Sequence, residues 1–305
     1  LIMLVVMMQQ VKVAPFSPES NRNRFLHVHY MSISHKDWGN GTSNGPMSVQ
    51  TAREVYKSLK TPEAVTVYCC MTVSTPVSLP GAPAIGADVR ETDDTFFHVF
   101  DFQFTDGKPY DEATFTAGRP VAVITESISR ALFGSIQSVG KEFLLSHAPY
   151  RVVGVVKDVS TLADMAYGQV WIPFTSTNLS NDTWSDNHMG MMSVTLLAHD
   201  REDFDEIRAE AKRRMNEYNS ILADQGYTLI DRNRPYDQET QSISFAANLE
   251  PDLKAARRER VIIFIILLLV PAINLSSMTQ SRLRQRVAEI GVRRAFGSTC
   301  IEMVG

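Results

Sequence analysis

The sequence has few cysteines and no complete nucleotide-binding or zinc-protease motif. Three cysteines in 305 residues cannot form a disulfide framework. The run Gly134–Lys141 resembles a phosphate-binding loop, but five residues separate its two glycines where the loop requires four. Glu142 also stands where that loop places its Mg²⁺-binding hydroxyl. We therefore expect no ATPase site, no other catalytic site and no bound cofactor on this chain.

An excess of positive charge is also absent from most of the chain. The formal net charge is −4, and residues 282–305 hold five of the 30 basic and two of the 34 acidic side chains. Residues 1–281 therefore carry 25 basic and 32 acidic side chains. An acidic segment of this size lacks the basic surface that binds nucleic acid, so we expect no nucleic-acid partner.

Charge is absent altogether from Val261–Ser281, whose first fifteen residues read VIIFIILLLVPAINL. A helix needs about 20 apolar residues to cross the hydrocarbon core of a bilayer, so this run is long enough. A buried core helix of a soluble protein is the alternative. Pro251 suits the first position of a helix that continues through Arg260. We interpret residues 251–281 as a stalk followed by a second transmembrane helix.

The two ends of the chain predict an orientation in the membrane. The opening LIMLVVMM lacks the basic residues of a signal peptide, and we interpret residues 1–9 as the end of a first transmembrane helix. Five arginines follow the second span, which places residues 282–305 in the cytoplasm by the positive-inside rule. Basic residues from Lys254 to Arg260 flank the other end, but charges on a long translocated domain have little influence. Residues 10–250 then lie outside the cytoplasm.

Residues 10–250 show the mixture of strands and helices that is typical of an α+β domain. We expect strands at Phe25–Ile33 and Ala64–Val73. Between them, Ser48 is positioned to cap a helix that ends at Leu59.

Three further stretches of this domain carry structural signals. The glycine-rich run Gly39–Pro46 is predicted to be a loop. A phenylalanine-rich stretch is interpreted as core, with a stacking platform for sugars or bases as the alternative, and its members are Phe96, Phe97, Phe100, Phe102 and Phe104. A predicted helix at Glu202–Leu222 repeats its apolar residues at steps of three and four, at Phe204, Ile207, Ala211, Met215, Tyr218 and Leu222.

Two pairs of potential metal ligands are weak candidates for sites. His27 and His29 share one face of a predicted strand, but a metal site needs more ligands, so we favour packing histidines over a metal centre. Cys69 and Cys70 are adjacent in a strand-like run. We interpret them as small buried residues, with a redox role as the alternative.

The segment after the apolar run resembles a known family. By spacing alone, residues 281–305 form a basic amphipathic helix that Gly297 ends. Within it, AEIGVRRAFGST resembles the cytoplasmic loop of bacterial ABC-transporter permeases of the MacB/FtsX superfamily, where the pattern E-I-G-x-x-R-A-x-G follows the second span. The resemblance implies a coupling helix that touches an ABC ATPase. The implied contact residues are Glu289, Ile290, Gly291, Arg293, Arg294, Ala295 and Gly297.

The resemblance extends into the domain between the spans. The strand–helix pattern of Pro120–Ser135, the strand pair of Val139–Val159 and the strand Gln169–Phe174 resemble the extracytoplasmic core domain of the same permeases. Lys108 departs from the family pattern, which has Arg there. The resemblance implies an α+β fold with a porter-like lobe, a smaller β-rich lobe inserted at about residues 90–160, and flanking transmembrane helices.

The resemblance implies a permease subunit of a MacB/FtsX-type ABC transporter in the bacterial cytoplasmic (inner) membrane. A separate cytoplasmic ATPase subunit would bind ATP and Mg²⁺, and the permease would transmit its motion to the extracytoplasmic domain for export, lipoprotein extraction or envelope-process regulation. A second permease subunit, in a homo- or heterodimer, and an envelope partner protein are also implied. Two alternatives are a two-span receptor with a ligand-binding ectodomain and an enzyme with a membrane anchor.

Overall fold

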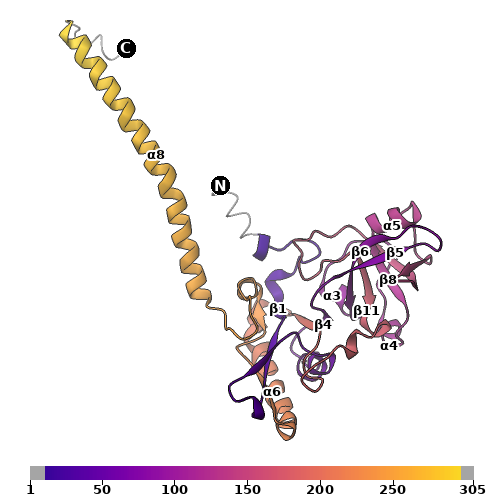
Figure 1. Ribbon diagram of the computed structural model, residues 1–305. Helices are drawn as coiled ribbons and strands as arrows, with labels where there is room; N and C mark the ends of the chain where they lie inside the picture. The colour runs from indigo at the N-terminus through magenta and orange to yellow at the C-terminus, as the bar shows by residue number, and fades with distance from the viewer. Residues whose placement is uncertain (1–10, 297–305) are drawn as a thin grey trace. The chain divides into compact units, whose positions relative to one another are not determined.

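The computed structural model describes residues 11–296 and consists of two compact units (Figure 1). One unit is Gln9–Pro251, and the other contains the long helix α8 (Leu253–Ala295). The expected end of a first transmembrane helix, residues 1–9, lies outside the described residues. Each unit is described below by itself.

The larger unit is built around a sheet of eleven strands. Its order is β11-β8-β10-β9-β5-β6-β4-β12-β1-β14, and β7 pairs with β10 beside this path. The strands are β1 (Phe25–Val28), β4 (Ala64–Cys69), β5 (Val73–Ser78), β6 (Ile85–Thr92), β7 (Phe104–Gly107), β8 (Val121–Thr125), β9 (Glu142–Leu145), β10 (Ala148–Val156), β11 (Val170–Pro173), β12 (Met192–Leu197) and β14 (Tyr236–Asp237).

Six of these strands close on themselves. Because β11 pairs with β8 on one side and with β6 on the other, the series β11-β8-β10-β9-β5-β6 forms a ring. The interior of the ring holds one of the buried clusters, which includes Val89, Ile124, Phe143 and Val170. The strands of this ring begin at Val73 and end at Pro173, so the ring overlaps the stretch of about residues 90–160 where a smaller lobe was expected and extends beyond it at both ends. A closed sheet leaves few unpaired strand edges.

A second sheet of three strands packs with a long helix. Its order is β13-β2-β3, with β2 at Met31–His35, β3 at Thr42–Gly45 and β13 at Tyr227–Ile230. The helix is α6 (Phe204–Leu222), and its buried residues are the six that were predicted: Phe204, Ile207, Ala211, Met215, Tyr218 and Leu222. They belong to the largest buried cluster together with Ile33 and Leu229 of the sheet.

Two predictions in this region are wrong. The run Gly39–Pro46 is not a loop throughout, because β3 pairs in register with β2 over Thr42–Gly45. The single strand expected at Phe25–Ile33 is two strands that belong to different sheets, β1 and β2. In the first case, pairing with the nearby β2 overrode the local turn propensity. In the second, β1 and β2 pair with different distant strands, β12 and β13.

The remaining helices of this unit are short. Ser48 caps α2 as predicted, since its Oγ accepts a hydrogen bond from Thr51 N at 3.1 Å, but the helix ends at Lys57 as a π-helical turn rather than at Leu59. The α-helices are α2 (Val49–Ala52), α3 (Phe96–Val99), α4 (Glu112–Thr116), α5 (Glu126–Phe133) and α7 (Gln238–Gln241), and single 3₁₀ turns lie at Arg22–Arg24, Lys36–Trp38, Phe174–Ser176, Leu179–Asn181, Arg201–Asp203 and Ala223–Gln225.

The phenylalanine-rich stretch forms core, as predicted. Phe96 and Phe100 are fully buried, with ring centroids 4.7 Å apart. Phe102 lies edge-on to the buried Trp171 of β11, with centroids 5.1 Å apart. Edge-on contacts of this kind suit the charge distribution of aromatic rings. Because these rings face one another inside the protein, they do not form an open stacking platform.

Helix α8 is one uninterrupted helix over 43 residues. Asp252 precedes it and accepts a hydrogen bond from Ala255 N at 2.9 Å, so the helix begins at Leu253 and not at Pro251 as expected. Pro271 lies inside it. The segment after Ser281, expected to form a separate amphipathic helix, continues the same helix without a break. The end of the membrane span at Ser281 stays a prediction.

The packing of α6 gives a test of stability. Ile207 is fully buried within the cluster between α6 and the three-stranded sheet, so Ile207→Ala is expected to reduce the free energy of unfolding by about 2–5 kcal/mol. The neighbouring Glu206→Ala is a matched control on the exposed face, with an expected change below about 0.5 kcal/mol. Urea unfolding followed by circular dichroism measures both. Equal changes in the two variants would contradict the packing described.

Candidate functional site

The apolar stretch of α8 is exposed along its length. Ile263, Leu268, Ile273 and Leu275 are between 46% and 65% exposed, and no residue of the most apolar window is buried. Within residues 11–296, α8 is the helix that is long and apolar enough to cross a membrane, over Leu253–Arg284. A core helix of a soluble protein would have its apolar side chains covered by the rest of the chain. Hydrocarbon is an environment that suits this surface.

The predicted ATPase-contact residues lie in the last turns of α8. The backbone of Glu289–Ala295 is helical, which places these residues within about 10 Å along the axis at ~1.5 Å per residue. Gly291 and Ala295 are exposed, and a Cβ added at Gly291 would contact nothing within 4 Å. Gly297 lies outside the described residues. The helical backbone therefore keeps these residues close together along the axis. Their contact with an ATPase stays a prediction.

In the larger unit, a buried ion pair fixes the connector that leads into the first strand. Glu19 and Arg22 are 0% and 3% exposed, and Arg22 Nη2 lies 2.6 Å from Glu19 Oε2. Arg22 Nε also donates to the same oxygen at 2.7 Å. The guanidinium lies over the ring of Phe16, with its Cζ 4.3 Å from the ring centroid. Both contacts are made to one carboxylate oxygen, and hydrogen bonds of this charge-assisted kind are stronger than those between neutral groups.

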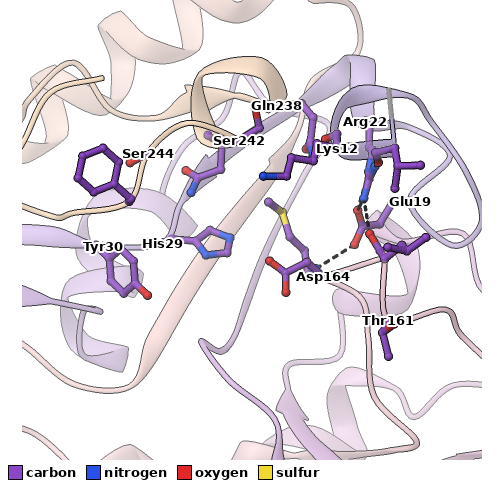
Figure 2. Close-up of a pocket in the computed structure, with 15 residues that line it drawn as sticks. Lys12, Glu19, Arg22, His29, Tyr30, Thr161, Asp164, Gln238, Ser242 and Ser244 are labelled. Carbon is purple, nitrogen blue, oxygen red and sulfur yellow. Dashed lines mark hydrogen bonds and ion pairs between the residues drawn. The ribbon is translucent and has the colours of Figure 1, made fainter. Parts of the chain in front are cut away.

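The same two side chains bond to backbone groups that are far apart in the sequence. Arg22 donates to the carbonyl oxygens of Val11 at 2.5 Å and Leu162 at 3.0 Å. Glu19 Oε1 accepts hydrogen bonds from the backbone N–H groups of Met165 and Ala166, both at 2.9 Å. The pair therefore joins residues 11–22 to the loop that precedes β11. Figure 2 shows Glu19 and Arg22 together on one side of a pocket, with their contacts drawn as dashed lines.

A second buried arginine holds the other side of this loop. Arg90 of β6 is 4% exposed and donates to the carbonyl oxygens of Cys69, Asp164 and Tyr167 at 2.6–3.0 Å. Together, Arg22 and Arg90 satisfy the backbone carbonyls of Leu162, Asp164 and Tyr167. Buried groups bonded in this way resist displacement, because each broken bond leaves an unpaired polar atom.

The pocket beside the ion pair has a volume of about 450 Å³. Figure 2 shows His29 between Tyr30 on one side and Asp164 on the other, with Lys12 nearby. Burial lowers the pKa of His29 to about 4, against the opposing charge of Asp164. Its Nε2 is buried and has no hydrogen-bond partner among the described residues. The imidazole is therefore neutral near pH 7, with no acid or nucleophile bonded to that nitrogen.

His27 is a packing residue, as predicted. It is fully buried, and its ring nitrogens bond to Thr195 Oγ1 at 3.1 Å and to Gln238 Oε1 at 2.9 Å. Burial lowers the pKa of His27 to about 3. Gln238 donates in turn to the carbonyl oxygen of Lys12 at 2.8 Å, which ties the connector to α7 as well. Within residues 11–296, no group of three or more His, Cys, Asp or Glu side chains could hold a metal ion.

One short string carries the letters of a hydrolase motif. Gly41–Gly45 reads G-T-S-N-G, which matches the nucleophile elbow of α/β-hydrolases letter for letter. That elbow requires a sharp turn between a strand and a helix, whereas Ser43 lies inside β3. Its Oγ accepts a hydrogen bond from Trp184 Nε1 at 3.1 Å. The string is therefore part of an ordinary strand. Cys69 is buried and Cys70 is half-buried, and both are free thiols.

Residues 1–214 match the MacB-like periplasmic core domain family, which is about 70% of the chain. The chain belongs to this family. The match includes the ring of strands, the connector with Glu19 and Arg22, and the beginning of α6. The core-domain resemblance expected from the sequence is therefore confirmed.

Several relatives carry transporter names. The chain is 21% identical over 220 residues to an uncharacterized ABC transporter permease, YknZ, of Bacillus subtilis, covering 70% of this chain and 49% of the relative. It is 25% identical over 216 residues to the pyoverdine export ATP-binding/permease protein PvdT of Pseudomonas syringae, covering 69% of this chain and 30% of the relative. The chain thus spans about half or less of the length of these relatives.

Solved structures of core domains also resemble the chain. The periplasmic region of MacB from Actinobacillus actinomycetemcomitans has 19% identity and a TM-score of 0.45, over 67% of this chain and 88% of that one. A domain of a putative permease protein from Porphyromonas gingivalis has 14% identity and a TM-score of 0.48, over 78% of this chain and 97% of that one.

Sequence reasoning did not find the Glu19–Arg22 pair. Residues 10–24 read as a polar, proline-containing connector, and nothing local marks these two side chains as buried. Their spacing of three residues was the available signal, since it suits a contact within one turn. The partners that bury the pair lie about 140 residues further along the chain.

Removing the arginine tests the role of the ion pair. Arg22→Met leaves the Glu19 carboxylate buried without a counter-charge, so the free energy of unfolding is expected to fall by about 3–5 kcal/mol near pH 7. Arg213→Met, at an exposed position of α6, is the control and is expected to change it by less than about 1 kcal/mol.

The loss in Arg22→Met is also expected to depend on pH. Burial raises the pKa of Glu19, and the charge of Arg22 lowers it, so the variant has a higher folded-state pKa than the wild type. Protonation at low pH then removes the buried charge, and the difference between variant and wild type shrinks as the pH falls from 7 toward 5. Urea unfolding at several pH values measures this. A difference that is independent of pH would contradict the assignment.

Proposed function

We propose that this chain is part of the permease subunit of a MacB/FtsX-type ABC transporter. The observation that carries the proposal is that a domain of the MacB-like periplasmic core family is followed, in one chain, by an uninterrupted helix with an exposed apolar stretch. In this proposal α8 crosses the bacterial inner membrane, and the domain of residues 10–250 lies on the extracytoplasmic side. The relatives named as permeases support the assignment.

The proposed energy source is a separate cytoplasmic ATPase subunit that binds ATP and Mg²⁺. The patch Glu289–Gly297 contacts that subunit, and α8 carries its displacement along the helix axis. A single helix suits this role because it has no slack linker between Leu253 and Ala295, although Pro271 leaves one backbone hydrogen bond unmade. A second permease subunit and an envelope partner complete the proposed assembly, and the work done is export, lipoprotein extraction or regulation of an envelope process.

The connector at the start of the core domain supports mechanical transmission. Arg22 and Gln238 bond to the backbone of residues 11 and 12, and Glu19 bonds to residues 165 and 166. A displacement of the connector would therefore act on the loop before β11 without an intervening flexible segment. The pair resists stretching because its two charges attract each other strongly where water is excluded.

Labelling tests the proposed orientation. In the full-length protein lacking Cys70 and Cys300, a cysteine is introduced either at exposed Asp205 of α6 or at exposed Val292 of α8. With a membrane-impermeant maleimide on intact spheroplasts, Asp205→Cys is expected to react and Val292→Cys only after permeabilisation, because the bilayer separates them. Equal reaction of both in intact spheroplasts would remove α8 as a membrane span.

Charge reversal tests the proposed ATPase contact. Full-length protein carrying Glu289→Lys or Arg294→Glu is purified by affinity, and the amount of ATPase subunit that co-purifies is measured. We expect at least tenfold less of it than with the wild type, because reversed charges repel at a close interface. Glu259→Lys is the matched control, because it changes the same charge on α8 at the opposite end of the apolar stretch. Equal ATPase recovery in all three variants would contradict the contact.

A further inference from the structure

A pocket beside the ring of strands combines apolar walls with cationic side chains. It has a volume of about 670 Å³ and is formed where four segments meet, at residues 107–114, 119–121, 139–140 and 151–153. Pockets of about 300–1,000 Å³ are the usual size for small-molecule ligands. We call it the cationic pocket. It is separate from the pocket that contains His29.

Close backbone packing holds the segments of the cationic pocket together. Gly107 has a φ of +66°, and a Cβ there would lie 2.2 Å from the carbonyl oxygen of Val153. The turn after β7 can approach β10 this closely only with glycine at that position. Lys108 N donates to the Val153 carbonyl at 3.2 Å, and Arg151 N donates to the Pro120 carbonyl at 3.0 Å. Strand β10 therefore carries one of the cations, and the segments that carry the other two are hydrogen-bonded to it.

Three cationic side chains line the pocket against one carboxylate. They are Lys108, Arg119 and Arg151, and the carboxylate is Asp111. Asp111 is already engaged as the cap of α4, where it accepts a hydrogen bond from Thr114 N at 2.9 Å. Hydrogen bonding from the Thr114 side chain, and then from its backbone N–H, holds the pKa of Asp111 below its usual range, so the carboxylate stays ionised and committed to the helix.

Two of the three cations are available to a ligand. Arg151 pairs with Glu142 at 3.1 Å on the surface. Lys108 and Arg119 are exposed and have no ion-pair partner within the part of the chain that the structure describes. This local excess of positive charge stands out because residues 1–281 hold more acidic than basic side chains. An anionic group placed between them would be attracted from solution.

The walls between the cations are apolar. Tyr110 is buried, and its hydroxyl group is bonded to Thr92. It can therefore present only the edge of its ring to the pocket. Val121 is buried, and Val139 is 43% exposed. Covering exposed apolar surface contributes about 25 cal/mol per Å², so a ligand with an apolar body gains from this wall. A small inorganic anion would use the charge and leave the wall uncovered.

We propose that the cationic pocket binds an amphipathic organic anion. Its carboxylate, sulfate or phosphate group pairs with Lys108 and Arg119, and its apolar part lies against the exposed Val139 and the accessible edges of Tyr110 and Val121. Arginine suits this role because its planar guanidinium can bind an oxyanion through two parallel hydrogen bonds. The proposal does not depend on the transport role, since it rests on the core domain alone.

Calorimetry on the full-length protein in phosphatidylcholine nanodiscs tests the proposal, with empty nanodiscs titrated as the reference. The probes are decanoate and decyltrimethylammonium, which share a ten-carbon chain and differ in the sign of the head group. Decanoate is expected to bind the protein above the reference, and decyltrimethylammonium is not. Lys108→Gln with Arg119→Gln is expected to weaken decanoate binding at least tenfold. Equal binding of both probes, or no binding of decanoate, would overturn the proposal.

A matched variant separates the pocket from general surface charge. Arg53→Gln with Lys60→Gln removes two exposed cations elsewhere in the same domain and is expected to leave decanoate binding unchanged. Unchanged thermal unfolding of both double variants shows that the fold is retained. Equal weakening in the two double variants would overturn the site.

The source of the anion is distinguished by a water-soluble short-chain lipid. If dihexanoylphosphatidylglycerol displaces decanoate more strongly than octanoate does, the site is assigned to an anionic lipid head group. Stronger competition by octanoate assigns it to a free carboxylate amphiphile. Failure of both to displace decanoate would overturn the proposal, since all three probes carry the proposed chemistry.

Discussion

The buried pair of Glu19 and Arg22 is the contact on which the arrangement of the core domain depends. Two ionised groups are removed from water, and they are stable there because each makes additional bonds to backbone groups. Those bonds reach residue 11 in one direction and residues 162–166 in the other. The connector is therefore fixed to the loop before β11, although about 140 residues separate them in the sequence. Apolar contacts would allow the connector to shift its position. These hydrogen bonds are directional, and breaking one would leave a buried charged or polar group without a partner, which costs free energy.

The ring of six strands gives the smaller lobe its own core. Because β11 pairs with both β6 and β8, the lobe has an enclosed interior, and Arg90 bonds it to the adjoining strand β4 and to the loop at 164–167. The cationic pocket lies on the outside of the same lobe, where β7 and the segments around β8 and β10 meet. The lobe thus combines an apolar interior that fixes its shape with a charged exterior pocket that a ligand can reach.

Part of this architecture could be predicted from the sequence, and the reason is local periodicity. The six buried residues of α6, the cap at Ser48 and the aromatic core were predicted because each depends on neighbours along the chain or on burial of large apolar rings. The loop at Gly39–Pro46 was wrong because pairing with the neighbouring β2 outweighed its turn residues. The single strand at Phe25–Ile33 was wrong because its two halves pair with different distant strands. The candidate ATPase contact was found by its motif, since its residues are contiguous. The burial of the Glu19–Arg22 pair and the cationic pocket could not be found in this way, because the groups that bury the pair and the segments that form the pocket are far apart in the chain.

The sequence alone determined the uncharged stretch of α8, the family pattern and the basic segment that follows. These features are fixed by composition and order, and they hold whatever the chain packs against. Only the tertiary structure decided that β11 closes the ring and that the connector is bonded to the loop at 162–166. Closure and burial depend on contacts between residues far apart in the chain. Local propensity carries no information about which distant partner satisfies a given hydrogen bond or charge.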